Sequence, residues 1–276
     1  MPATDSPPER MSRRRFLIAA LTGVGAVATG YATGEAYRFA VERPSMHIPG
    51  LAEPVRIAFL TDLHYGPYVR AGSVTAWVDA TMRERPDLVV LGGDLVDAMG
   101  PTNPKPLLAA LAALDAPLGV FTVWGNHDHA RFRRLGEFER MLSEAGITVL
   151  RNRGVRVRDD LFLAGIDDVR SGRPDIPAAL AERPNGAACI LVSHNPDALP
   201  DIPTDVDLTL CGHTHGGQIR IPLVGPIFTS SRYGRRFLAG WVSGPGRGYV
   251  SRGLGVTLVP LRVACPAELT VLDVSG

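Results

Sequence analysis

Two histidines in this chain lie at the end of an apolar run, in a setting typical of metal ligands. His213 and His215 follow the apolar residues 206–210 and are flanked by glycines. Imidazole binds first-row transition metals well, and glycine lets the backbone pass close to an ion. Two histidines separated by one residue cannot easily both be core residues. The stretch therefore predicts a metal site where a strand breaks into a loop.

Four other apolar runs also end in polar or imidazole side chains. The polar and imidazole residues at the ends of the five apolar runs are Asp62, His64, Asp94, Asn126, His127, His194, His213 and His215. Such groups are costly at the ends of buried strands unless something pairs with them. Two divalent cations (Mn, Fe or Zn) would be a common partner, because carboxylates, imidazoles and an amide oxygen suit these metals. Such metals lower the pKa of bound water to about 7, so the chemistry predicted is attack of metal-activated hydroxide on phosphorus.

The elements that must position these side chains alternate between strands and helices. The expected strands are residues 55–60, 87–91, 119–123, 188–192, 206–210 and 268–274, with a hairpin formed by 155–158 and 161–166. The expected helices cover about 72–84, 107–114 and 132–145. Strand, polar cluster and helix recur three times, which indicates a mostly parallel sheet with its site at the carboxyl ends of the strands. The second half of the chain shows the same pattern, so we expect an α/β fold of two sheets with helices outside.

The N-terminus has the pattern of an export signal. Ser12-Arg13-Arg14-Arg15-Phe16-Leu17 is followed by an uncharged run that extends to Gly34. The paired arginines with Phe-Leu behind them resemble the twin-arginine signal, whose machinery exports folded proteins. The run is also about long enough to span a bilayer, so an uncleaved membrane anchor stays open as an alternative. The expected division is a signal or anchor at 1–40, a linker at 41–54 and a catalytic domain at 55–276.

The composition excludes some classes of protein. Over 276 residues the formal net charge is +1, which gives no reason to expect a specific nucleic-acid partner. Three scattered cysteines are too few for a disulfide framework. Cys211 precedes the histidine pair but belongs to an apolar run, so packing in the core is favoured over metal ligation.

The polar clusters, taken in order, resemble the motifs of the calcineurin-like metallophosphoesterases. The matching segments are Asp62-x-His64, Gly93-Asp94, Gly125-Asn126-His127-Asp128, His194 and Gly212-His213-x-His215. Farther on, Ser251 to Gly255, Arg262 and Cys265 to Glu268 resemble the exported YkuE/YaeI-like branch of that family. The resemblance implies a four-layer α/β/β/α sandwich of two mixed sheets.

The resemblance also implies a role for each motif residue. The first metal would be held by Asp62, His64 and His215, and the second by Asn126, His194 and His213, with Asp94 bridging both. His127 would lie beside the substrate phosphate and either protonate the leaving oxygen or stabilise the transition state. Asp128 would orient His127 through a hydrogen bond. His129 matches no ligand position and is expected at the rim.

A group of arginines follows the last motif. Arg232, Arg235 and Arg252, with Arg236 and Arg247, could clamp a second phosphate or face anionic lipid headgroups. A solvated surface loop is an equally good interpretation. We keep the first three as candidate substrate contacts.

The sequence thus predicts an exported, two-metal phosphoesterase of the cell envelope that acts on a phosphodiester or pyrophosphate bond. The relatives' activities implied by the resemblance include hydrolysis of UDP-2,3-diacylglucosamine, so a lipid-linked substrate is among the expectations. A phosphomonoesterase, nucleotidase or nuclease on the same metals is an alternative, because the motifs describe the metals and not the pocket. A non-catalytic metal-binding module of the same fold is an alternative of another class.

Overall fold

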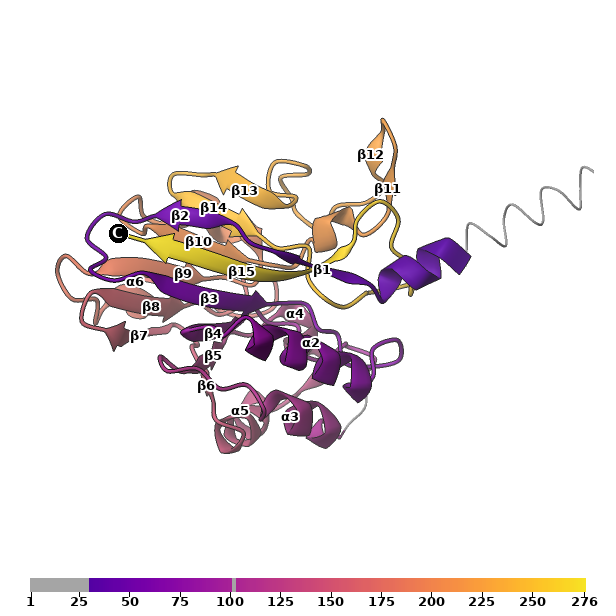
Figure 1. Ribbon diagram of the computed structural model, residues 1–276, viewed down its shortest axis with the longest axis horizontal. Helices are drawn as coiled ribbons and strands as arrows, with labels where there is room; N and C mark the ends of the chain where they lie inside the picture. Colours follow the sequence, from indigo (N-terminus) through magenta and orange to yellow (C-terminus); the bar gives the residue numbers. More distant parts are fainter. Residues whose placement is uncertain (1–29, 101–102) are drawn as a thin grey trace, which may run out of the picture.

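Two mixed β-sheets lie face to face in the computed structural model, which describes residues 30–100 and 103–276 (Figure 1). Within these ranges the first sheet has seven strands: β1 (Phe39–Glu42), β2 (Ser45–His47), β3 (Val55–Leu60), β4 (Leu88–Leu91), β5 (Val120–Thr122), β6 (Ile147–Val149) and β15 (Ala267–Ser275). Strands β3 to β6 are parallel to one another, and β15 runs antiparallel to β3. The first half of the chain therefore has the parallel core that its alternating pattern predicts.

The second sheet has six strands within the same ranges: β7 (Arg153–Arg158), β8 (Leu161–Gly165), β9 (Ala188–Val192), β10 (Leu208–Cys211), β13 (Gly240–Ser243) and β14 (Arg247–Val250). Strands β8, β9, β10 and β14 are parallel, and β7 and β13 form antiparallel edges. A small hairpin of β11 (Arg220–Ile221) and β12 (Gly225–Pro226) lies apart from both sheets.

Alternation along the strands divides the apolar side chains between layers. In β3, Ala58 and Leu60 pack with the helices, whereas Ile57 and Phe59 pack between the two sheets. This is the period of two that a strand buried on both faces requires.

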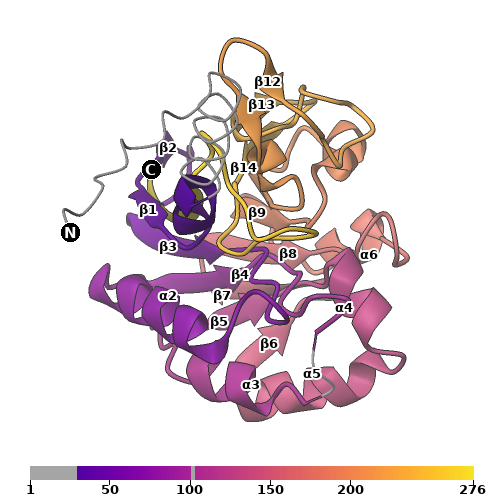
Figure 2. The same cartoon turned by 90° about the vertical axis from the view of Figure 1, so that its right-hand side faces the viewer.

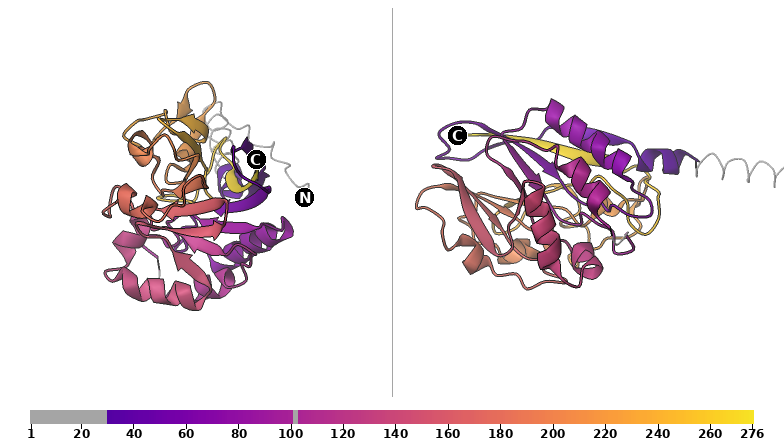
Figure 3. Two further views of the ribbon diagram at one scale, coloured as in Figure 1. Left: turned by 90° about the vertical axis from the view of Figure 1, so that its left-hand side faces the viewer. Right: turned by 90° about the horizontal axis from the view of Figure 1, so that it is seen from below.

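Helices cover the outer faces of the two sheets (Figures 2 and 3). The first sheet is covered by α2 (Ala71–Arg83), α3 (Lys105–Leu111) and α5 (Leu135–Glu144), and the second by α6 (Ile176–Leu180) and the 3₁₀ helix η1 (Pro196–Asp201). Two short helices, α4 (Asn126–Arg131) and the 3₁₀ turn η2 (His215–Gly217), follow strand ends. The layers are helix, sheet, sheet, helix, as predicted, although the second helical layer is thin.

Two details of the local structure differ from the expectation. The helix expected over 132–145 is α5, and a further helix that was not expected, α4, precedes it, so Asn126 to Asp128 lie in the first turn of a helix. The linker expected at 41–54 contains the end of β1 and all of β2, and both strands pair with β15. The sheet therefore begins at Phe39, well before the catalytic boundary that the sequence suggests.

The predicted signal lies largely outside the described residues. Of the uncharged run, only residues 30–34 are described, and they belong to a helix over 30–36. Within the described parts of the chain, no helix has the length and apolar character needed to cross a membrane.

Candidate metal centre

The carboxyl ends of strands from both sheets bring the predicted ligands to one place. Asp62 and His64 follow β3, Asp94 follows β4, and Asn126 begins α4 just after β5. From the second sheet, His194 follows β9, and His213 and His215 follow β10. Because the sheets pack face to face, their strand ends meet at one edge of the sandwich.

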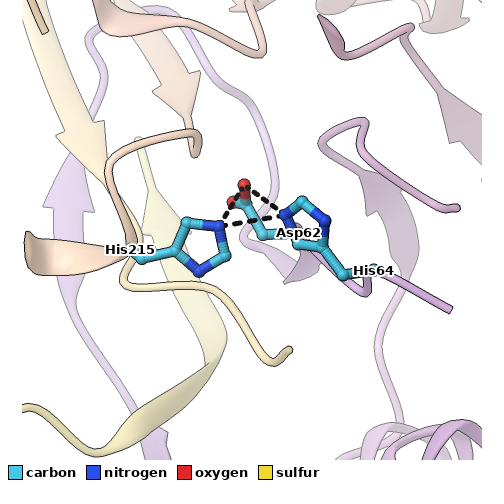
Figure 4. A group of neighbouring side chains, drawn as sticks. All are labelled: Asp62, His64 and His215. Carbon is cyan, nitrogen blue, oxygen red and sulfur yellow. Dashed lines mark hydrogen bonds and ion pairs between the residues drawn. The ribbon is translucent and has the colours of Figure 1, made fainter. Parts of the chain in front are cut away.

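The first cluster consists of Asp62, His64 and His215, all buried (Figure 4). The Nε2 atoms of His64 and His215 are 3.0 Å apart, and Asp62 Oδ1 lies 3.4 Å from His215 Nε2 and 3.8 Å from His64 Nε2. Two ring nitrogens that face each other at this distance repel unless a proton or a cation lies between them. The three donor atoms therefore point at a common position for a cation.

The second cluster consists of Asp94, His194 and His213, also buried. His194 Nε2 lies 3.2 Å from Asp94 Oδ2 and 3.2 Å from His213 Nδ1. The same Asp94 Oδ2 is 3.5 Å from His64 Nε2 in the first cluster. Asp94 thus presents one carboxylate oxygen to both clusters.

An unpaired polar atom shows that the site lacks a partner of its own. The side-chain oxygen of Asn126 is buried and accepts no hydrogen bond. Buried polar atoms of this kind normally have a partner. Carboxylate, imidazole and amide-oxygen donors in this number fit a pair of divalent metals.

The pKa values of the candidate ligands indicate that the site needs positive charge. Burial raises the pKa values of Asp62 and Asp94, but the surrounding imidazoles outweigh it and lower both below the ordinary range. Burial lowers the pKa of His213 to about 4 and that of His215 well below its usual value, so both rings are neutral near pH 7. Burial would also lower the pKa of His64, but hydrogen bonds with Asp62 and Asp97 raise it to about 9. Positive charge at the site must come from protons on such rings or from metal ions.

The backbone at the site is strained. Asp62, His64, Asp94, His213 and His215 all have positive φ, between 48° and 69°. Residues other than glycine rarely adopt this region, and such strain concentrates at functional sites.

Hydrogen bonds between the strand ends hold this conformation in place. The amide of His64 donates to the carbonyl of Asp94 (3.0 Å), and the amide of His213 donates to the Asp62 carboxylate (3.0 Å). Glycines permit this close approach. A side chain at Gly212 would collide with the Asp62 carboxylate, and one at Gly125 would collide with that of Asp94.

His127 lies at the edge of the first cluster, with its ring against that of His64 at a centroid distance of 4.5 Å. Its Nδ1 accepts a hydrogen bond from the amide of Ala98 (3.1 Å). Because Nδ1 is occupied as an acceptor, the neutral ring carries its proton on Nε2. Burial is the main cause of a lowered pKa for His127, which favours this neutral form near pH 7.

Asp128 does not have the role that the sequence suggests. Its carboxylate accepts hydrogen bonds from the amides of Val96 (3.1 Å) and Gly125 (3.0 Å), and none from His127. Asp128 is completely buried and caps the first turn of α4. Burial, with a contribution from Asp94, raises its pKa to about 7. It supports the segment that carries Asn126 and His127, and Ala98, not Asp128, sets the tautomer of His127.

Asp97 is a site residue that the sequence analysis missed. Its Oδ2 lies 3.4 Å from His64 Nδ1 and 3.7 Å from His127 Nδ1. A carboxylate behind the second nitrogen of a ligating imidazole fixes its orientation. Its signal in the sequence is weak: Asp97 is three residues beyond Asp94, with apolar Leu95 and Val96 between them.

The three candidate substrate arginines have different surroundings. Arg252 forms ion pairs with Glu42 (2.6 Å) and Glu268 (3.2 Å), and its role as a substrate contact stays a prediction. Arg235 packs against Gly225 of the β11–β12 hairpin. Arg232 donates to the carbonyl of Asp197 and lines a pocket near the second cluster.

That pocket has a volume of about 420 Å³ and is also lined by Arg170, Phe228, Asn195 and Ser230. Asn195 adjoins His194 along the chain, and Ser230 Oγ donates to the carbonyl of His213 (3.0 Å). The positive charge of Arg170 helps to lower the pKa of His213, after burial and His194. Arg170 was not identified from the sequence, where nothing separates it from other surface arginines.

Two residues that were not expected to be metal ligands, His129 and Cys211, lie outside both clusters. His129 is 2.7 Å from Asp167 and not in either cluster, and Cys211 is a buried free cysteine packed among apolar side chains.

Comparison with known proteins independently indicates phosphoester chemistry. Residues 55–217 match the family described as "Calcineurin-like phosphoesterase". The "Uncharacterized metallophosphoesterase YkuE" of Bacillus subtilis is 33% identical over 293 residues, which cover 97% of this chain and 99% of the relative. "Phosphodiesterase YaeI" of Escherichia coli is 35% identical over 234 residues, which cover 80% of this chain and 83% of the relative.

Among solved structures, a Thermus thermophilus sulfate thiohydrolase SoxB in complex with glycerol matches with a TM-score of 0.45 and 15% identity. The match covers 80% of this chain and 56% of that chain.

Proposed function

Because the chain belongs to the calcineurin-like phosphoesterase family and is thus a metal-dependent phosphoester hydrolase, we propose that it uses two metals to cleave a phosphodiester or pyrophosphate bond. The observation that carries the two-metal proposal is the position of Asp94 Oδ2, within 3.5 Å of imidazole nitrogens from both clusters. A bridging carboxylate of this kind holds two cations side by side.

The geometry supports these residue roles. Asp62, His64 and His215 would hold one metal, His194 and His213 the other, and Asp94 both. Asn126, whose buried side-chain oxygen has no hydrogen bond, would complete the second site. Divalent metals bound there would act as Lewis acids and lower the pKa of water to about 7. The Nε2 proton of His127, fixed by the Ala98 amide at Nδ1, is available to the leaving oxygen or to the developing charge on phosphate.

Arg170 and Arg232 suggest where the rest of the substrate binds. Both residues line the pocket beside His194 and His213, and Arg232 Nε also lies 3.9 Å from the Asp197 carboxylate. Guanidinium groups recognise phosphate well, so a second phosphate of a pyrophosphate, or the far side of a diester, fits there. The name of YaeI as a phosphodiesterase supports cleavage of a diester.

The site of action is the cell envelope in this proposal. The twin-arginine pattern at residues 12–17 supports export of the folded protein, followed either by release or by retention through the uncharged run. An envelope location favours a lipid-linked or polymer-linked phosphate over a soluble cytoplasmic nucleotide.

A substrate panel tests the reaction. We expect manganese-dependent turnover of bis(p-nitrophenyl) phosphate or of a pyrophosphate, lost on chelation and restored by Mn²⁺. Asp94→Asn should lower kcat/KM by at least about 1000-fold, because the bridging charge is lost. Asp273→Asn, which breaks an ion pair of partly exposed residues with Arg56, is the matched control and should change it less than about twofold. Full activity of Asp94→Asn would contradict two-metal catalysis, and a clear preference for p-nitrophenyl phosphate or nucleic acid would replace the diester by the corresponding alternative.

A further inference from the structure

Exposed apolar side chains are concentrated at one end of the molecule. Among the described residues, nine of the eleven exposed large apolar side chains belong to three segments: residues 30–37, 219–228 and 257–264. We call these segments together the apolar face. Large apolar clusters on a soluble surface indicate a binding surface.

The three segments form one continuous surface. The amide of Arg262 donates to the carbonyl of Ala32 (3.0 Å), which joins the loop 257–264 to the helix. The side chain of Gln218 donates to the carbonyls of Thr257 and Val259 (both 3.1 Å), which joins the same loop to the base of the hairpin. Figure 1 shows the helix ahead of β1, the loop before β15 and the hairpin β11–β12 at the same end, with the hairpin protruding.

The two tips of this surface carry leucine where the backbone favours other residues. Leu223 has φ 67° and is fully exposed, and Leu258 has φ 62° and is 69% exposed. Asparagine and glycine tolerate this conformation better than leucine, and solvent exposure also favours a polar residue. Leucine at both tips is therefore unexplained by folding alone and indicates contact with an apolar environment.

Two of the three segments of the apolar face, residues 219–228 and 257–264, carry only positive charge, whereas the helix carries Glu35. Between Asp207 and Glu268 the sequence has seven arginines and no lysine, aspartate or glutamate. Arg220, Arg235 and Arg236 lie in or just after the hairpin, and among the described residues none of them has a carboxylate partner. Apolar side chains flanked by arginines that have no carboxylate partner are the combination that binds anionic membrane surfaces.

The path of the chain points to the same occupant. The uncharged run of residues 16–34 ends in the helix of the apolar face, so this run is continuous in sequence with the apolar face. Exposed Tyr31 and Tyr37 add aromatic rings of the kind enriched at membrane interfaces. A protruding hairpin also needs no matching surface in a bilayer, whereas a stable protein interface needs about 800 Å² on each partner.

We propose that the apolar face docks the protein on an anionic lipid bilayer, with Leu223, Val224 and Leu258 in the interfacial layer and the arginines at the headgroups. Because the hairpin follows directly after His213 and His215, docking holds the metal centre near the lipid surface. This consequence for substrate access rests on the proposed function, whereas the docking itself does not.

The test is a fluorophore placed on the hairpin of the full chain. The three native cysteines are buried, so a Val224→Cys variant takes an environment-sensitive label at the hairpin tip. Asp159→Cys is the matched control, because that fully exposed side chain lies in the β7–β8 turn at the opposite end (Figure 1). The vesicles are phosphatidylcholine with about 30 mol % phosphatidylglycerol, with and without a quencher on the acyl chains.

We expect acyl-chain quenching of the label at Val224, reduced in pure phosphatidylcholine or at high salt, and no quenching of the label at Asp159. Adding Leu223→Asn and Leu258→Asn to the Val224→Cys variant should weaken hairpin insertion by at least about fivefold. Asparagine suits the positive φ at both positions, so the fold is retained.

Three results would overturn the proposal. One is a vesicle-bound protein whose Val224 label is not quenched, which means that the N-terminal run alone holds it. Another is quenching unchanged by the two asparagines. The third is a change in the Val224 label that depends on protein concentration without lipid, which assigns the apolar face to a second copy of the chain.

Discussion

The metal ligands were recognisable from the sequence, because they are polar residues at the ends of apolar runs. The residues that support these ligands were not recognisable. Asp94 and His194 stand out because a charged or imidazole side chain follows a run of apolar residues. The role of Asp128 depends on which amide groups lie within reach, and one of them belongs to Val96, 32 residues away. Asp97 likewise becomes significant only because β4 and β5 bring it beside His127. Hydrogen-bond partners across such distances follow from the fold, not from spacing.

The first prediction separates His127 from Asp128. His127→Asn should lower kcat by about 100-fold to 10000-fold with metal content unchanged, because it removes the proton donor. Asp128→Asn should instead lower the free energy of unfolding by about 1 to 3 kcal/mol, because one buried amide loses its acceptor, while kcat stays within about tenfold. Steady-state kinetics and denaturant unfolding measure the two effects. If Asp128→Asn lowers kcat as much as His127→Asn does and leaves the stability unchanged, then Asp128 is the residue that orients His127.

The second prediction concerns Asp97 as a positioning residue. Asp97→Asn should raise the Mn²⁺ concentration that gives half-maximal activity by about 10-fold to 100-fold, since the carboxylate behind His64 Nδ1 is lost. Activity at saturating Mn²⁺ should recover most of the wild-type kcat, which a general loss of folding would not allow. An unchanged Mn²⁺ requirement would show that His64 needs no such support.

At the scale of elements, long apolar runs were predictable and short pairings were not. β3 and β9 have the predicted limits, because runs of buried apolar residues, interrupted in β3 only by Arg56, leave few alternatives. β1 and β2 are only four and three residues long, and their partner β15 lies more than 200 residues away. Pairing of this kind depends on contacts that a local pattern does not contain.

The loop over residues 167–173 is another element that the sequence did not reveal. The Asp167 carboxylate contacts His129 Nε2 (2.7 Å), Arg151 Nε (3.0 Å) and the amide of Arg173 (3.0 Å). Asp168 accepts from the amides of Arg170 and Ser171. These contacts hold Arg170 at the pocket beside the metal centre.

The third prediction is a pH-dependent contribution of His129 to this loop. The hydrogen bond with Asp167 raises the pKa of His129 in the folded state. The stabilisation is therefore fully present below the unfolded pKa of about 6.5 and is lost as pH rises through the higher folded pKa. His129→Gln should lower the free energy of unfolding by about 1 kcal/mol more at pH 6 than at pH 9. This figure is reduced for solvent screening, because His129 is partly exposed. Denaturant unfolding at both pH values measures this, with His47→Gln, at an exposed position of β2, as control. The same loss at both pH values would contradict a charged pair.

On the scale of the whole molecule, the metal centre exists only because two sheets meet. Asp62 and Asp94 come from the first sheet, and His194 and His213 from the second. The strand-end rule allowed this convergence to be predicted from the sequence. The apolar face could not be predicted in the same way, because Leu223 and Leu258 look like core residues until their neighbours are known.

The fourth prediction concerns where the whole protein acts. Arg13→Lys with Arg14→Lys should leave nearly all of the protein in the cytoplasm, because the paired arginines are the recognised part of the signal. Cell fractionation of wild type and variant, in cells with and without the twin-arginine machinery, measures this. Export of the double variant, or export without that machinery, would contradict the proposed route.

The most direct test of the central claim is anomalous diffraction from crystals of the protein grown with Mn²⁺. Two manganese peaks about 3.5 to 4 Å apart, on either side of the Asp94 carboxylate, are the predicted result. Crystals of Asp94→Asn grown in the same way should lose at least one of the peaks. A single peak or none at saturating Mn²⁺ in the wild-type protein would contradict a two-metal hydrolase.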